Sequence, residues 1–136
     1  MNRRNFIICA AATLVAPKIT MAAGSETLDY VPGLIKEKLQ AGETVLVDFA
    51  ADWCSTCKRQ ERVISSLREA DPTLDEHITF IRVDWDEYGS SEVATSRNVP
   101  RRSTLLLLKG DEELGRIIAG TQVNEIQALL SRGVPG

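Results

Sequence analysis

The sequence has little of several features that would mark a specialised class of protein. Its 136 residues include only three cysteines, five prolines and nine glycines, and 5% of them are aromatic. Three cysteines are too few for a disulfide scaffold, and so little glycine and proline excludes a collagen-like or linker protein. The 16 basic and 19 acidic residues give a net charge of −3. This balance lacks the basic excess of a nucleic-acid-binding protein, so the composition indicates one folded, mildly acidic domain.

The first 23 residues have the pattern of an export signal. Met1–Arg4 carries two arginines, Phe6–Ala16 is a short apolar run that contains Cys9, and Pro17 ends it. A basic start followed by an apolar segment too short to span a bilayer is typical of a signal peptide. The order Arg-Arg-Asn-Phe-Ile resembles the bacterial twin-arginine signal. We expect residues 1–23 to be removed on export, by the twin-arginine or the general secretory route, and residues 24–136 to form a periplasmic domain; the alternative is a buried N-terminal helix.

The hydrophobic pattern predicts an α/β domain in which helices and strands alternate. Helices are predicted by apolar residues at helical spacing, and strands by apolar runs between turn residues. The predicted helices are Tyr30–Gln40, Cys54–Ala70, Ser90–Arg97 and Val123–Leu130 (capped by Thr121), and the predicted strands are Thr44–Ala50, Ile78–Trp85, Ser103–Lys109 and Glu113–Ala119. Because βα units precede a terminal hairpin, we expect a mixed central sheet of about four or five strands with helices on both faces.

The reactive residues are expected in the segment Cys54-Ser55-Thr56-Cys57, which lies between a predicted strand and a predicted helix. The N-terminus of a helix carries partial positive charge and free N–H groups, which stabilise a thiolate. A thiol one helical turn further along can attack a disulfide formed at the first sulfur. We therefore assign Cys54 as the nucleophile and Cys57 as the resolving thiol. The alternatives are a structural disulfide, which would stabilise little in so small a loop, and a metal site, for which His77 is the other soft candidate.

The segment from Val45 to Lys58, Val-Leu-Val-Asp-Phe-Ala-Ala-Asp-Trp-Cys-Ser-Thr-Cys-Lys, resembles the active-site segment of the thioredoxin superfamily. The resemblance extends to the strand Thr104–Leu108 and to Gly120. The order from Ala51 to Lys58, with Glu61 beyond it, is similar to the C-terminal periplasmic domain of the disulfide reductase DsbD. The resemblance implies a thioredoxin-like fold and a redox-active cysteine pair.

The same resemblance implies roles for three further residues. Asp48 matches the buried acid beneath the cysteine pair, where desolvation would raise its pKa and let it accept the Cys57 proton through water. The alternative is a hydrogen-bonded core aspartate. Trp53 matches the tryptophan that shields the site, unless it is only a packing aromatic. Lys58 would add positive charge near Cys54, unless it is a solvated residue of the first helical turn. Trp85 and Tyr88 are assigned to packing.

Two positions depart from the family pattern. Arg62 stands where thioredoxins carry a kinking proline, which again favours the DsbD-like branch. Ser103 stands where the family places a cis-proline before the Thr-Leu-Leu strand. Because a cis bond before serine costs about 3–4 kcal/mol, we predict a trans Arg102–Ser103 bond. The alternatives are a retained cis bond, and an alignment in which Pro100 is the cis-proline.

The loop 101–104 is expected to bind substrate. Ser103 would offer a backbone N–H and a hydroxyl to a bound peptide or to a thiolate, and Thr104 follows it at the start of the strand. Arg101 and Arg102 would place positive charge on the same rim, favouring the Cys54 thiolate and acidic target segments. The alternative is that both arginines are solvated loop residues.

The sequence thus predicts a monomeric periplasmic thiol–disulfide oxidoreductase that reduces or exchanges protein or peptide disulfides. No nicotinamide or flavin fingerprint occurs, so no cofactor is expected and electrons would come from an upstream redox protein. No nucleic-acid partner is expected. Two other classes stay open: a periplasmic metallochaperone holding Cu(I) between Cys54 and Cys57, and a non-catalytic thioredoxin-like binding module.

Overall fold

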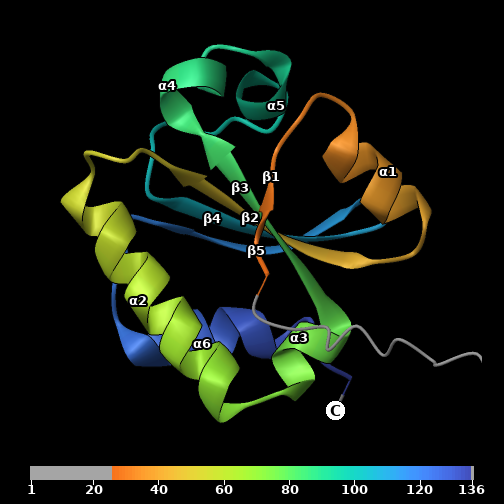
Figure 1. The fold of residues 1–136 in the computed structure, drawn as a ribbon. Coiled ribbons are helices and arrows are strands. Elements are labelled where there is room, and N and C mark those ends of the chain that lie inside the picture. Colours follow the sequence, from red (N-terminus) through yellow and green to blue (C-terminus); the bar gives the residue numbers. More distant parts are fainter. Residues whose placement is uncertain (1–25, 136) are drawn as a thin grey trace, which may run out of the picture.

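The computed structural model describes residues 26–135, which form a mixed five-stranded sheet with helices on both faces (Figure 1). The strand order is β1-β3-β2-β4-β5. Strands β1, β3 and β2 run parallel, whereas β4 is antiparallel to both β2 and β5. The predicted α/β fold class is confirmed. The expected signal peptide, its removal and the domain boundary at residue 23 lie outside the described residues.

Eleven elements make up the described part of the chain. They are β1 (Leu28–Asp29), α1 (Leu34–Gln40), β2 (Thr44–Ala50), α2 (Ser55–Ala70), α3 (Thr73–His77), β3 (Ile78–Asp84), α4 (Trp85–Tyr88), α5 (Glu92–Thr95), β4 (Thr104–Lys109), β5 (Glu112–Ile118) and α6 (Val123–Ser131). All four predicted strands are present, each within one residue of its predicted bounds. No helix of residues 26–135 is long and apolar enough to cross a membrane.

The two faces of β2 pack into separate cores because side chains alternate along a strand. Val45, Val47 and Phe49 belong to the core beneath α1, α4 and α5. Leu46 belongs to the core beneath α2, α3 and α6. Asp48 shares the Leu46 face, so the one carboxylate of this buried strand lies on the α2 side.

Three local predictions are wrong. The first helix begins at Leu34 instead of Tyr30, because Gly33 precedes it with a left-handed φ of 89° that a helix interior does not accept. The helix predicted over 90–97 is shorter than expected, because only Glu92–Thr95 form α5; a second short helix, α4, precedes it and was not predicted. Thr121 does not cap α6, whose N-cap is Gln122 without a side-chain hydrogen bond.

The sheet brings two distant loops to one edge. β2 ends at Ala50 just before the cysteine motif, and β4 runs antiparallel beside it with Thr104 opposite Phe49. The loop before β4 therefore meets the start of α2.

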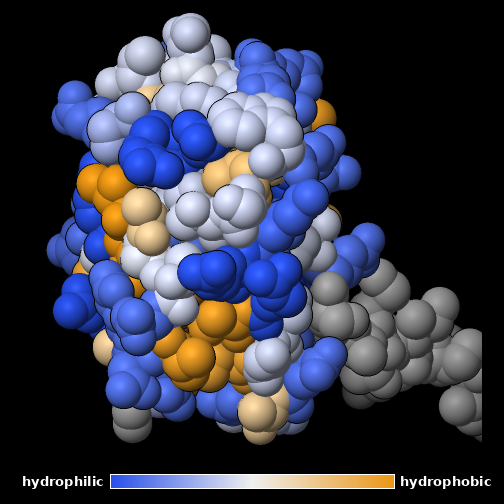
Figure 2. Space-filling view, turned by 90° about the vertical axis from the view of Figure 1, so that its left-hand side faces the viewer, coloured by the Kyte–Doolittle hydropathy of each residue, from blue (hydrophilic) through white to orange (hydrophobic). Residues whose placement is uncertain are grey.

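Figure 2 shows one side of the molecule, where hydrophobic surface is confined to small patches among polar and charged residues.

Candidate active site

The two cysteines lie where the sequence predicted, at the start of a helix. Cys54 is the N-cap of α2, and its Sγ accepts a hydrogen bond of 3.2 Å from the backbone N–H of Cys57. Both thiols are free, and both are buried, with exposed fractions of 3% for Cys54 and 1% for Cys57. Exposure thus differs only slightly, so any difference in reactivity must come from the electrostatics of the two sulfurs.

The pKa values of the two thiols are shifted in opposite directions. Burial alone would raise the pKa of the Cys54 thiol, but hydrogen bonds from Cys57, Ser103 and Arg102 outweigh it and lower that pKa to about 7. Burial raises the pKa of Cys57, and the neighbouring Cys54 raises it further. Near neutral pH, Cys54 therefore carries the thiolate and Cys57 keeps its proton, as the assignment of nucleophile and resolving thiol requires.

Ser103 belongs to the loop before β4, and its side chain lies between the two cysteines. Its hydroxyl lies 3.2 Å from Cys54 Sγ and 3.1 Å from Cys57 Sγ. Residues 26–135 contain no cis peptide bond, which confirms the predicted trans Arg102–Ser103 bond. One expectation is corrected: the Ser103 N–H donates to the carbonyl of Phe49 at 2.7 Å, so it is not free to bind a peptide.

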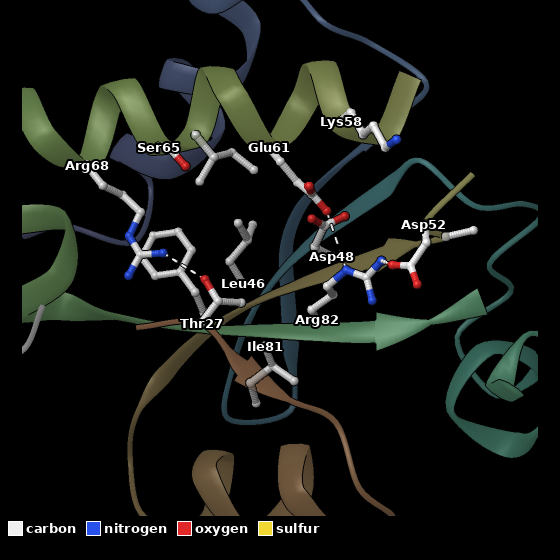
Figure 3. A pocket seen from close by; sticks show the side chains of 13 residues that line it. Thr27, Leu46, Asp48, Asp52, Lys58, Glu61, Ser65, Arg68, Ile81 and Arg82 are labelled. Atoms are coloured by element: carbon white, nitrogen blue, oxygen red, sulfur yellow. Dashed lines mark hydrogen bonds and ion pairs between the residues drawn. The ribbon is translucent and has the colours of Figure 1, made fainter. Parts of the chain in front are cut away.

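Asp48 lies close enough to Cys54 for their charges to interact. Its carboxyl is 8% exposed and points from β2 toward α2, beside Glu61 (Figure 3). Burial raises the pKa of Asp48 to about 7; the nearby charges of Glu61 and Cys54 raise it as well, while Arg82 opposes them. Its Oδ1 atom has no hydrogen-bond partner within residues 26–135. A carboxyl in this state can hold or release a proton near neutral pH.

A cavity of about 550 Å³ extends from Asp48 along α2. Its rim near Asp48 carries an ionic cluster that sequence reasoning missed: Arg82 lies 3.4 Å from a Glu61 oxygen and 3.0 Å from an Asp52 oxygen (Figure 3). Arg82 is the β3 residue paired with Asp48 in the sheet register. No local pattern around Arg82 indicates this role; a predicted register between β2 and β3 would have placed the two side by side.

Gln60 is a second residue that sequence reasoning missed. It is completely buried in α2, and its Nε2 donates to the carbonyls of Ser103 at 3.0 Å and Gly120 at 2.9 Å. Its Oε1 has no hydrogen-bond partner in the described part of the chain. Gln60 thus joins α2 to the loops before β4 and after β5. A polar residue on the apolar side of α2 was the available signal.

Trp53 and Arg102 form the exposed edge of the site. Trp53 is 60% exposed, its Nε1 donates to both carboxyl oxygens of Asp86, and the Arg102 guanidinium lies 4.2 Å from its ring centre. Arg102 also lowers the pKa of Cys54, so this arginine supports the thiolate as expected. Lys58 lines the cavity with Asp48, and its expected effect on Cys54 stays a prediction.

The rest of the loop holds its own shape. Arg101 turns back to donate to the carbonyl of Arg102 at 3.1 Å. Thr104 is completely buried and donates to the carbonyl of Arg101 at 2.7 Å, which corrects its expected contact with substrate. Trp85 and Tyr88 pack edge-on against Phe49 and Tyr30, as predicted. Within residues 26–135, no group of three or more His, Cys, Asp or Glu side chains converges that could hold a metal ion.

Comparison with known proteins identifies a matching family and individual relatives. The Thioredoxin family model matches residues 30–132. Thioredoxin-2 of Pyricularia oryzae is 34% identical over 100 residues, covering 74% of this chain and 54% of that protein. Thioredoxin H2-1 of Oryza sativa subsp. japonica is 36% identical over 87 residues, covering 64% of this chain and 58% of that protein. The chain thus spans little more than half the length of these two relatives.

Solved structures agree on the fold. The crystal structure of Trxlp from Edwardsiella tarda matches with a TM-score of 0.68 and 30% identity, covering 77% of this chain and 98% of that one. The thioredoxin NaTrxh of Nicotiana alata matches with a TM-score of 0.66 and 26% identity, covering 82% and 96%. With the family model covering more than half of the sequence, and the cysteine pair at the start of α2, the chain belongs to the thioredoxin family.

Proposed function

We propose that this protein is a thiol–disulfide oxidoreductase that reduces or exchanges disulfides of proteins or peptides. The observation that carries the proposal is the opposite tuning of two adjacent thiols: a thiolate-forming Cys54 at the start of α2, and a protonated Cys57 one turn later. This is what a nucleophile and a resolving thiol need. Thioredoxin relatives support the same chemistry.

The reaction moves two electrons from the protein to its substrate. The Cys54 thiolate attacks one sulfur of the substrate disulfide, forming a mixed disulfide and releasing the first substrate thiolate, which takes a proton from solvent. Cys57 then loses its proton to Asp48 and attacks Cys54 Sγ, which breaks the mixed disulfide and releases the second substrate thiolate. A Cys54–Cys57 disulfide remains, and an upstream redox protein returns it to the dithiol.

Asp48 is suited to receive the Cys57 proton. Its pKa of about 7 means that a fraction of the carboxyl is ionised and able to accept a proton at neutral pH. The cavity that it lines has ample room for the water through which the proton would pass. The ion pair of Glu61 and Arg82 lies on the rim of the same cavity.

The finer assignment is to a periplasmic reductase similar to the C-terminal domain of DsbD, acting as a monomer. The export-signal pattern of residues 1–23, the motif from Ala51 to Glu61 and the non-proline Arg62 support it. Fractionation of cells expressing the full chain tests the location, with periplasmic recovery of a shortened protein as the expected result. Recovery only of full-length protein in the cytoplasm would contradict it.

Insulin reduction with dithiothreitol as electron source tests the activity. Cys54→Ser should reduce the rate to that of the reductant alone, and Cys57→Ser should trap a mixed disulfide that is visible by mass. Ser55→Ala, an exposed position within the motif, is the matched control and should keep the wild-type rate. Full activity of Cys54→Ser would refute the proposal. Copper titration of the wild-type protein, with Cys54→Ser as the control that lacks one ligand, would then test the metallochaperone alternative.

A further inference from the structure

The Ser103 hydroxyl occupies an unusual place between the two sulfurs. It lies within hydrogen-bond reach of both, at 3.2 Å from Cys54 and 3.1 Å from Cys57, and its side chain is completely buried. Within residues 26–135 these sulfurs are the partners of this hydroxyl. A hydroxyl can donate one hydrogen bond while it accepts another. Ser103 can therefore donate to the Cys54 thiolate and accept from the Cys57 thiol at the same time.

The backbone of Ser103 is fixed without help from the sulfurs. Its φ of 62° is in the left-handed region, which a residue with a Cβ seldom adopts. Such a conformation persists when surrounding contacts over-determine it. The Ser103 N–H donates to Phe49 O at 2.7 Å, and its carbonyl accepts from Ala119 N at 2.8 Å and Gln60 Nε2 at 3.0 Å. Three hydrogen bonds thus hold the hydroxyl where the cysteines meet.

We propose that Ser103 is a positioning residue that raises the reduction potential of the Cys54–Cys57 couple by hydrogen-bonding the reduced pair. A thiolate is a strong acceptor, whereas a disulfide sulfur is a weak acceptor and has no proton to give. Oxidation therefore removes both hydrogen bonds and leaves a buried hydroxyl unpaired, which is unfavourable. Whatever stabilises the dithiol makes the couple more oxidising.

This inference deepens the proposed function and rests on it only in that the cysteine pair cycles between dithiol and disulfide. It also explains a polar side chain at a position where the resemblance leads one to expect proline. The hydroxyl acts on the cysteines alone: its burial leaves no surface for substrate. Ser103 thus sets how readily the pair gives up electrons, while binding of the target belongs to the exposed edge of the site.

Equilibration with glutathione tests the inference. In that reaction the protein disulfide and two glutathione thiols give the protein dithiol and one glutathione disulfide. Ser103→Ala should shift the equilibrium constant about tenfold toward the protein disulfide, which is about 30 mV toward a more reducing couple. The rate of Cys54 alkylation at neutral pH should fall about fivefold, because less of the thiol is ionised.

Two further variants separate the hydroxyl from the backbone. Ser103→Gly removes the hydroxyl at a φ that glycine accepts readily, so it should fold and show the same shift as Ser103→Ala. Ala119→Gly is the matched control, since Ala119 has the same φ of 62° in the neighbouring loop and its side chain has no hydroxyl. It should leave the potential unchanged.

The outcomes are distinct. Unchanged potentials in both Ser103 variants would overturn the inference, and so would an equal shift in Ala119→Gly, because backbone strain would then be the cause. Insulin reduction by the wild-type protein alongside unchanged potentials would leave the proposed function standing. Lowered potentials in the Ser103 variants, with a wild-type protein that does not reduce insulin, would support the role of Ser103 and reject the proposed function.

Discussion

Two buried polar sites lie on the same face of the sheet, one near each end of α2, and they are built in opposite ways (Figure 3). In the last turn, Arg68 is 8% exposed and all its guanidinium nitrogens have partners: Asp75 at 2.6 Å, the Thr27 hydroxyl at 2.9 Å and the Glu26 carbonyl at 3.3 Å. The guanidinium also lies 3.9 Å from the ring centre of Phe80. This buried charge thus has a carboxylate partner, two further hydrogen-bond acceptors and an aromatic ring beside it.

The site around the cysteines, near the start of α2, has the reverse arrangement. Three buried side-chain atoms lack a hydrogen-bond partner within the described residues, and all belong to the active site: Asp48 Oδ1, Gln60 Oε1 and Arg102 Nε. An unpaired buried polar atom destabilises a fold by about 1–3 kcal/mol. The comparison shows that the buried charge at one end of α2 is paired, whereas the buried polar side chains around the cysteines keep atoms without a partner among the described residues.

The largest expected effect concerns stability against pH. Because the pKa of folded Asp48 is raised to about 7, the folded protein retains a proton that the unfolded chain has released above its ordinary pKa. The free energy of unfolding should therefore fall as pH rises from about 4 to about 7. Asp48→Asn should be as stable as wild type near pH 4, and more stable by up to about 4 kcal/mol above pH 7, in urea denaturation. A difference that does not change with pH would show that the pKa of Asp48 is the same in the folded and unfolded protein, which contradicts the raised value.

A substitution of Arg68 tests the other site, in which the buried charge is paired. Arg68→Ala should lower the free energy of unfolding by about 3 kcal/mol, because Asp75 loses a close charge partner and three hydrogen bonds disappear together. The alkylation rate of Cys54 should not change. Arg62→Ala, an exposed arginine of the same helix, should stay within about 0.5 kcal/mol of wild type. Equal stabilities of Arg68→Ala and Arg62→Ala would remove the contrast between the two sites.

Asp48 should also control one chemical step. Asp48→Asn should slow resolution of the mixed disulfide about hundredfold and leave its formation near the wild-type rate, since only Cys57 needs the proton acceptor. Stopped-flow measurement with a disulfide peptide separates the two steps. Asp52→Asn is the control, because this exposed carboxylate contacts the same Arg82. If Asp48→Asn leaves both steps unchanged, the carboxyl is only a core residue.

The smallest effect is expected at the rim. Replacing Arg101 and Arg102 together by alanine should weaken reduction of an acidic disulfide peptide several-fold relative to a basic one, and high salt should erase that ratio. Replacing Arg59 and Arg62, exposed arginines of α2, removes the same charge elsewhere and should leave the ratio unchanged. An equal loss with acidic and basic peptides would show that Arg102 acts through Cys54 alone.

Sequence reasoning succeeded where the signal is local. The apolar run of β2, the helical spacing of α2 and the cysteine motif between them each lie within one short segment. It missed β1, which has two residues, and the short helices α3 and α4. The positions of Gln60 and Arg82 depend on contacts between elements far apart in sequence, which no periodicity encodes.

Ser103 shows both sides of this limit. The departure from the family pattern at this position drew attention to it, and the energy of a cis bond before serine predicted the trans geometry that the structure has. The sequence did not indicate that Ser103 would be buried, with a positive φ and three hydrogen bonds to its backbone groups. As a result the N–H was assigned to a substrate when it belongs to the sheet edge.

The central claim is that burial raises the pKa of the Asp48 carboxyl so that it can exchange a proton near neutral pH. Titration of the Asp48 carboxyl carbon by NMR in the reduced protein measures this directly, with Asp48→Asn to assign the signal. The structure predicts a midpoint of about 7. A midpoint of about 4, that of an ordinary aspartate, would contradict the account.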